Sequence, residues 1–358
     1  MRETYDQEMI RQRSKLAGSH RNTGMPSTKV IKMKSRIIYG PILSRRLGRS
    51  LGIDIIKKRE FRKNCNFDCV YCQLGHVDWK ISTPSDVTDP VTTEEVIDGI
   101  TNYHKKVDDL DYITFSGTCE PTLNLELGNM IEQIRQISDI PICVITNSSL
   151  VNRKDVRENL SKADLVVATL VSGNEKTFQA INRPAGGIEL QDIIEGLREL
   201  QKMKGPKVAI EVMLLDSTND YPVNSSDEEV GKLIEVLRYI DPDEIEILTT
   251  SRPPAEDFII PVPETRLKEI AQKFDEELGR ERVRLVLKGL KRKRSNIKHE
   301  NLVDEVYDLI LRRPCTFEQV VQSLDIGKEE LAPILEGLVG EQKIIEILSE
   351  NGTYYRPT

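Results

Sequence analysis

Three cysteines within eight residues constrain this chain more than any other feature. Cys65, Cys69 and Cys72 have the spacing C-x3-C-x2-C, and Tyr71 directly precedes the third cysteine. Thiolates at this density bind soft metals, and iron–sulfur clusters are held by cysteine thiolates. Three thiolates leave one iron of a four-iron cluster open to another ligand. The pattern therefore predicts one [4Fe–4S] cluster with an accessible iron.

A zinc site and a chance grouping of thiols are the alternatives. Structural zinc takes four protein ligands, usually from two separated pairs. The sequence has no second Cys or Cys/His pair at that spacing, although His76 is close enough in sequence to complete a zinc site. Cys119, Cys143 and Cys315 are scattered, and we interpret Cys143 and Cys315 as ordinary buried thiols. An odd set of thiols without an export signal argues against disulfides.

Bulk composition limits the class of protein. The 358 residues suffice for one large domain and a small one. A net charge of −7 argues against a globally basic nucleic-acid binder. No apolar run approaches the ~18 residues that span a bilayer, and the N-terminus lacks the apolar core of a signal peptide. We expect a cytoplasmic protein in a reducing compartment, with no membrane partner.

Strand and helix patterns alternate along most of the chain. The expected strands are 51–56, 112–115, 142–146, 165–170, 208–215 and 244–248, with a possible edge strand at 283–287. The expected helices are 92–107, 125–137, 153–160, 175–181, 188–203, 226–240 and 267–278. This order predicts an α/β fold with a parallel sheet and right-handed crossovers. Six units are too few to close an eightfold barrel, so we expect a partial one.

Polar residues end or follow several of these strands. Ligands of such sheets bind at the carboxyl ends of the strands. The residues expected to converge there are Cys65, Glu120, Asn147, Thr169 and Arg252.

The two ends of the chain differ from its middle. Residues 1–33 are polar and are expected to form a flexible extension, followed by the barrel at 34–290 and a basic linker at 291–299. Residues 300–358 predict three helices and a hairpin, a pattern similar to a winged helix. The third helix is acidic, which argues against insertion into a DNA groove, so contact with protein or with nucleic acid both remain open.

The cysteine stretch resembles the signature of radical S-adenosylmethionine (radical SAM) enzymes. The resemblance extends over residues 37–290, and the runs at 39–54, 182–184 and 249–256 are similar to iron–sulfur oxidoreductases related to the wyosine-base synthases. It implies a partial (βα)6 barrel, S-adenosyl-L-methionine as cofactor and an external electron donor. It also implies a 5′-deoxyadenosyl radical that abstracts hydrogen from a substrate.

The resemblance further assigns roles to residues. Cys65, Cys69 and Cys72 would hold the cluster, and the implied cofactor-binding residues are Tyr71, Gly117, Thr118, Glu120, Asn147 and Thr169. Tyr71 would pack near the adenine, Thr169 near the ribose, and the turn from Gly117 to Glu120 would hold the methionine end. Cys119 replaces the usual glycine, which is costly only if the backbone there is left-handed. Catalytic residues toward the substrate are not identified.

The substrate is the open question. The wyosine-base synthases use additional N-terminal cysteines for a second cluster, and this chain has no cysteine before Cys65. A single-cluster enzyme that modifies a macromolecule, RNA or protein, fits the C-terminal domain better. An activase that makes a glycyl radical in a partner enzyme, and a non-catalytic redox regulator that binds DNA, are the alternatives. Arg45, Arg46 and Arg49 are candidates to hold phosphate or carboxylate groups.

Overall fold

The computed structural model describes residues 37–57, 63–103, 109–279, 281–287, 299–349 and 352–358. These residues belong to one compact unit, Ser35–Thr358. The predicted N-terminal extension, and the predicted linker apart from His299, lie outside the described residues.

The central element of the described chain is an open nine-stranded sheet. Its order is β1 (Ile38–Ser44), β2 (Gly48–Ile53), β3 (Tyr112–Phe115), β4 (Ile142–Thr146), β5 (Leu165–Thr169), β6 (Lys207–Ser217), β7 (Glu244–Thr249) and β9 (Val283–Leu285), while β8 (Ile259–Pro261) pairs with β6. Neighbours from β2 to β7, and β7 with β9, are parallel. Because β1 and β9 end the order, the partial barrel predicted from the sequence is confirmed.

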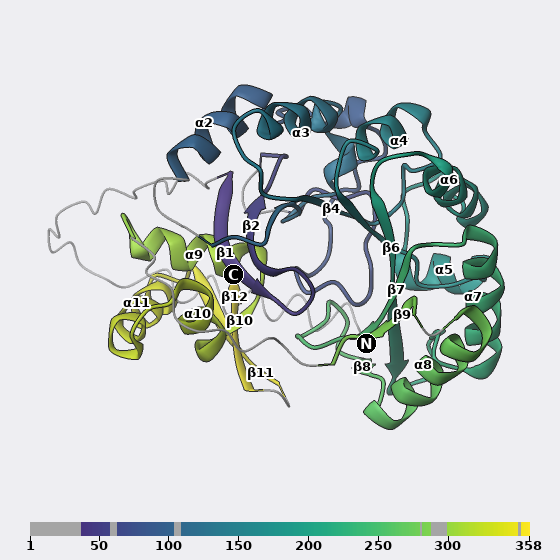
Figure 1. Ribbon diagram of the computed structural model, residues 1–358. Helices are drawn as coiled ribbons and strands as arrows, with labels where there is room; N and C mark the ends of the chain where they lie inside the picture. The colour runs from purple at the N-terminus through teal and green to yellow at the C-terminus, as the bar shows by residue number, and fades with distance from the viewer. Residues whose placement is uncertain (1–36, 58–62, 104–108, 280, 288–298, 350–351) are drawn as a thin grey trace, which may run out of the picture. The chain divides into compact units, whose positions relative to one another are not determined.

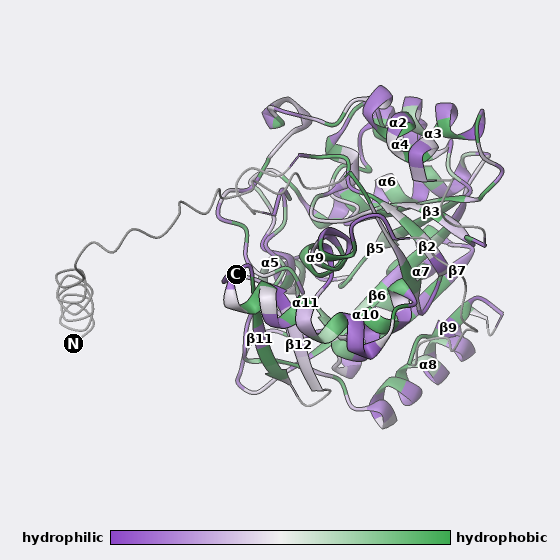
Figure 2. Ribbon diagram, turned by 90° about the vertical axis from the view of Figure 1, so that its left-hand side faces the viewer, coloured by the Kyte–Doolittle hydropathy of each residue, from purple (hydrophilic) through white to green (hydrophobic). Residues whose placement is uncertain are grey.

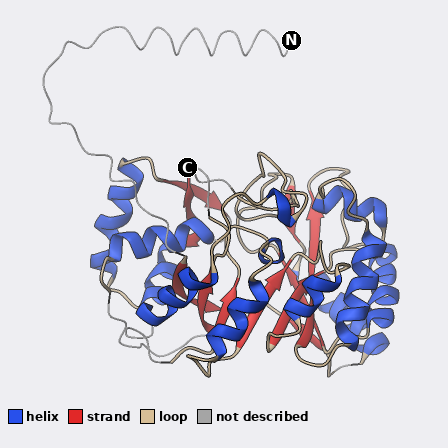
Figure 3. Cartoon of the chain, turned by 90° about the horizontal axis from the view of Figure 1, so that it is seen from above, coloured by secondary structure: helices blue, strands red, loops and turns tan. Residues whose placement is uncertain are grey.

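Helices follow the strands in alternation and lie outside the sheet (Figures 1 and 3). They are α2 (Thr93–Tyr103), α3 (Leu127–Arg135), α4 (Lys154–Leu160), α5 (Glu175–Asn182), α6 (Leu190–Lys202), α7 (Asp227–Ile240) and α8 (Glu264–Leu278). Helix α7 shows how local sequence sets the ends of a helix. The Ser226 hydroxyl accepts a hydrogen bond from the Glu229 amide at its start, and Asp241 ends it in the left-handed conformation. Figure 2 shows hydrophilic and hydrophobic segments alternating along α8, as expected of an amphipathic helix.

Two strands of this sheet were not expected. Strand β1 contains Gly40-Pro41, which is typical of a turn, yet it pairs antiparallel with β2 and its register shifts between Tyr39 and Ile42. Proline is tolerated there because β1 is an edge strand. Strand β8 is too short for an alternating pattern to show. Strand β2 also begins before the predicted 51–56 and ends at Ile53.

The C-terminal segment, residues 299–349 and 352–358, contains α9 (Leu302–Arg312), α10 (Phe317–Leu324) and α11 (Lys328–Gly340). Its antiparallel sheet has the order β10 (Cys315–Thr316), β12 (Gly352–Pro357), β11 (Ile344–Ser349). The helices and the hairpin lie where they were expected, whereas β10 was not predicted; the winged-helix assignment stays a prediction. Helices α9 and α10 contact β1. Within the described residues, no helix is long and apolar enough to cross a membrane.

Candidate active site

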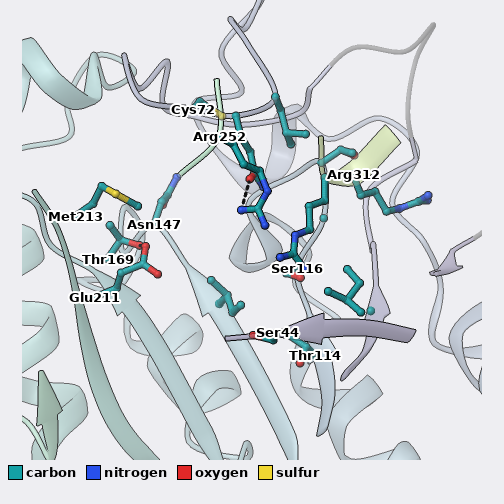
Figure 4. A pocket seen from close by; sticks show the side chains of 18 of the residues that line it. Ser44, Cys72, Thr114, Ser116, Asn147, Thr169, Glu211, Met213, Arg252 and Arg312 are labelled. Atoms are coloured by element: carbon teal, nitrogen blue, oxygen red, sulfur yellow. Dashed lines mark hydrogen bonds between the residues drawn. The ribbon is translucent and has the colours of Figure 1, made fainter. Parts of the chain in front are cut away.

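A cavity of about 380 Å³ opens at the carboxyl ends of the parallel strands. The residues proposed from the sequence for the cluster and the cofactor all line it: Cys65, Cys69, Tyr71, Cys72, Gly117, Thr118, Glu120, Asn147 and Thr169. Arg252 lines the same cavity. Figure 4 shows Asn147, Thr169 and Glu211 on one side, with Arg252 and Arg312 across from them. Residues far apart in sequence are therefore gathered at one mouth, as expected.

The cysteine loop is fastened to the end of helix α5. The Asp68 amide donates to the Asn182 carbonyl at 3.0 Å, and the Val70 amide donates to the Ile181 carbonyl at 2.9 Å. Phe67 is buried and packs edge-on against Phe178, with ring centroids 5.7 Å apart. The run at 182–184 was singled out by resemblance only, and these contacts give it a physical role, because its first residue helps to hold the loop in place.

Two amides donate hydrogen bonds to the thiols of the loop. Asn147 Nδ2 lies 3.4 Å from Cys65 Sγ, and Asn182 Nδ2 lies 3.3 Å from Cys69 Sγ. The thiols form no disulfide. Burial raises the pKa of Cys65 to about 12 and the pKa of Cys69 to about 11. Cysteine binds metal as the thiolate, so metal binding must displace the protons of Cys65 and Cys69.

In an iron–sulfur cluster each thiolate binds a different iron, so the three thiols need not surround one ion. Nowhere in the described part of the chain are three His, Cys, Asp or Glu side chains placed around a single metal ion. His76, the candidate fourth zinc ligand, has its Nδ1 3.3 Å from a carboxylate oxygen of Asp68.

Glu120 is a buried carboxylate held in one orientation. Its Oε1 accepts hydrogen bonds from the hydroxyls of Thr122 and Thr146, both at 2.7 Å. Its Oε2 accepts a hydrogen bond from the backbone amide of Asn147 at 2.7 Å. Burial raises the pKa of Glu120, while these hydrogen bonds act in the opposite direction. The side chain lines the cavity, and Oε2 retains room for a further donor. Glu120 can therefore accept a hydrogen bond from a cationic group in the cavity.

The turn before Glu120 is built on Asp54. The Thr118 amide and hydroxyl donate to Asp54 Oδ2 at 3.2 and 2.9 Å, and Cys119 Sγ lies 3.2 Å from Asp54 Oδ1. Gly117 has φ +137°, and a Cβ there would lie 2.6 Å from Asp54 Cγ, so glycine is required. Cys119 is not among the described residues with positive φ, so it carries no left-handed backbone cost.

Asp54 also joins the C-terminal segment to this turn. Arg312 Nε donates to Asp54 Oδ2 at 3.0 Å, and the two side chains are only 2% and 3% exposed. Arg312 also pairs with Asp308 at 3.1 Å and stacks over the Tyr39 ring at 4.6 Å. Neither Asp54 nor Arg312 was predicted as a site residue, because 258 positions separate them and no motif links them.

The candidate arginines of the β1–β2 region have different partners. Arg46 contacts Glu211 and lies 2.9 Å from Glu246, so it holds carboxylates of the protein itself. Thr169 donates to Glu211 at 3.2 Å and so belongs to the same network. Arg49 is buried and does not line the cavity, whereas Arg45 does.

Comparison with known proteins decides the family. The model of the radical SAM superfamily matches residues 60–224. The chain belongs to the radical SAM superfamily. It is 32% identical over 326 residues to the UPF0026 protein MJ1312 of Methanocaldococcus jannaschii, covering 89% of this chain and 95% of that protein, and so belongs to the UPF0026 family. This radical SAM protein is an enzyme and uses a [4Fe–4S] cluster and S-adenosylmethionine, as the sequence predicted.

Two further likenesses extend over part of the matched proteins. A protein named GTPase Obg from Brachyspira hyodysenteriae is 31% identical over 315 residues. The match covers 88% of this chain but 44% of that relative, so the chain spans less than half of its length. The structure of Streptococcus suis SuiB bound to the precursor peptide SuiA has a TM-score of 0.47 and 15% identity, with 79% of this chain and 60% of that chain covered.

Proposed function

We propose that this radical SAM enzyme cleaves S-adenosylmethionine reductively and abstracts a hydrogen atom from a macromolecular substrate, RNA or protein. The observation that carries the proposal is the cavity, because the three thiols of one loop and the carboxylate of Glu120 line the same space. When bound, the reduced cluster and S-adenosylmethionine supply a 5′-deoxyadenosyl radical, which the protein must position and shield from water.

The cysteine loop is the proposed cluster site. Cys65, Cys69 and Cys72 would hold the cluster, which would supply the electron for cofactor cleavage. Asn147 and Asn182 orient the sulfur atoms of Cys65 and Cys69 through the N–H···S contacts described above. Hydrogen bonds of this kind tune an iron–sulfur centre, so both amides act as positioning residues.

The strand ends are the proposed cofactor site. Glu120 binds the ammonium of the methionine moiety, since its carboxylate is buried and held by other donors. Asn147 and Thr169 bind polar groups nearby, and Tyr71 packs against the adenine. Gly117 permits the close turn, and Thr118 fixes that turn because its amide and hydroxyl both donate to Asp54.

The remaining parts of the proposal concern partners. An external donor supplies the electron, and the free thiols fit a reducing compartment such as the cytoplasm. The C-terminal segment contributes to substrate recognition, since its Arg313 lines the cavity.

The test is formation of 5′-deoxyadenosine by the full-length protein, reconstituted with iron and sulfide without oxygen and then reduced. We expect the wild type to form it and Cys65→Ala to form none, because one cluster ligand is lost. Cys143→Ala is the matched control, since Cys143 is a buried thiol that does not line the cavity. Equal yields from wild type and Cys65→Ala would refute the proposed cluster site.

A further inference from the structure

We propose that Arg45, Arg252 and Arg313 together bind an oxyanion of the substrate, a phosphate or carboxylate group. This oxyanion site rests on the proposed function and specifies the substrate class: the molecule that enters the cavity carries a negative group. All three arginines line the cavity, and each comes from a different segment. Arg45 lies between β1 and β2, Arg252 follows β7, and Arg313 follows α9.

The three segments are fastened to one another in a ring. Arg45 Nη2 donates to Ser251 Oγ at 2.9 Å, next to Arg252. Arg252 Nε donates to the Pro314 carbonyl at 3.0 Å, next to Arg313. Arg313 Nη1 in turn donates to the Leu43 carbonyl at 3.4 Å, close to Arg45 in the chain.

These bonds leave the three positive charges without a carboxylate. No ion pair in the described part of the chain involves Arg45, Arg252 or Arg313, whose hydrogen bonds go to carbonyl, hydroxyl and amide oxygens. The adjacent Arg46 and Arg312 differ, because each pairs with two carboxylates. Burial, reinforced by the charges of Arg313 and Arg45, lowers the pKa of Arg252 to about 9. Within the described residues, this positive charge has no carboxylate in an ion pair, and a negatively charged ligand would compensate it.

The chemistry of guanidinium groups indicates the ligand. Their planar forks of donors match the oxygens of phosphate and carboxylate groups, often two bonds at a time. S-adenosylmethionine does not supply enough negative charge, since its one carboxylate is outweighed by its ammonium and its sulfonium. Arg252 Nη1 also donates to Gln73 Oε1 at 3.1 Å, which places the oxyanion site beside the cysteine loop. An anion bound there would hold the substrate next to the cluster.

The site would also explain why the C-terminal segment packs on the barrel. Arg313 belongs to that segment, whereas Arg45 and Arg252 belong to the barrel. The oxyanion site is complete only when both parts are present. The C-terminal segment then recognises the substrate directly, through the Arg313 side chain in the cavity.

The experiment is a calorimetric titration of the full-length protein with inorganic phosphate and, separately, with acetate, at low ionic strength. We expect saturable binding, weakened about tenfold or more in Arg252→Gln and Arg313→Gln, because each loses charge-assisted hydrogen bonds. Arg238→Gln is the matched control, since Arg238 is a surface arginine paired with Glu277 at 2.7 Å, and it should bind like the wild type. Tighter binding of phosphate indicates a phosphate-bearing substrate, and tighter binding of acetate a carboxylate.

Absence of saturable binding of both anions to the wild type would overturn the proposal, as would equal weakening in the Arg238→Gln control. If a glutamine variant does not fold, Arg252→Lys and Arg313→Lys replace it. These variants retain the charge but lose the planar set of guanidinium donors, so they should still weaken anion binding. The titration needs neither S-adenosylmethionine nor reduction, so its failure is distinct from failure of radical chemistry. A parallel loss of S-adenosylmethionine affinity in both arginine variants would assign the site to the cofactor and overturn it as a substrate site.

Discussion

The two sides of the cavity treat charge in opposite ways. On the cofactor side, Asp54 and Glu120 are buried carboxylates whose oxygens accept hydrogen bonds from fixed donors, and Asp54 is neutralised by Arg312. On the arginine side, Arg45 and Arg252 donate to neutral oxygens. Carboxylates that already accept hydrogen bonds are held in one orientation and can fix a cofactor in one pose. Guanidinium groups without a carboxylate partner are suited to a ligand that carries negative charge. The charges on the cofactor side therefore stabilise the protein, whereas those on the arginine side are available to bind a ligand.

The largest expected effect is on stability. Asp54→Asn should lower the free energy of unfolding by about 3–5 kcal/mol, because it removes one partner of a buried ion pair and leaves the Arg312 guanidinium with Asp308 alone. Arg252→Gln should change it by less than about 1 kcal/mol or raise it, since an uncompensated positive charge is removed. Chemical denaturation of both variants measures this. A larger loss in Arg252→Gln than in Asp54→Asn would reverse the assignment of the two sides.

A smaller effect is expected at Cys119. Its thiol contacts Asp54, but Thr118 and Arg312 also satisfy that carboxylate, and the backbone at Cys119 is not left-handed. Cys119→Gly should therefore cost about 0.5–1 kcal/mol of stability through backbone entropy and keep S-adenosylmethionine cleavage. Chemical denaturation measures the stability, and chromatography of 5′-deoxyadenosine and of the substrate product measures cleavage and turnover. Normal cleavage with lost substrate turnover would instead give the thiol a part in the chemistry.

Much of this fold follows from local pattern. The strands at 112–115 and 142–146 were predicted with the bounds that the structure has, because each is a short apolar run between turn signals. Strand β1 was missed, since Gly40-Pro41 breaks the pattern, and only pairing with β2 makes it a strand. Strand β10 has two residues and exists only through its pairing with β12. The local propensity of a segment does not predict pairing with a strand elsewhere in the chain.

The site divides in the same way. Cys65, Cys69 and Cys72 could be proposed as cluster ligands from the sequence, because their spacing alone is typical of an iron–sulfur loop. The Asp54–Arg312 pair could not, because it joins the barrel to the C-terminal segment. A chain that ends near residue 290 would contain every residue that the sequence implies for cofactor binding. The structure gives a reason to expect lower stability from such a truncation, since Asp54 would lose its buried partner.

The central claim is that the cofactor side binds S-adenosylmethionine at the cluster while the arginine side does not. The direct measurement is the electron paramagnetic resonance spectrum of the reduced cluster, titrated with S-adenosylmethionine. We expect the cofactor to change the spectrum of the wild type and of Arg252→Gln at similar concentrations, and to require about tenfold more in Glu120→Gln, which loses a charge-assisted bond. A wild-type spectrum that is unaffected by S-adenosylmethionine, or a titration weakened by Arg252→Gln as much as by Glu120→Gln, would contradict the account.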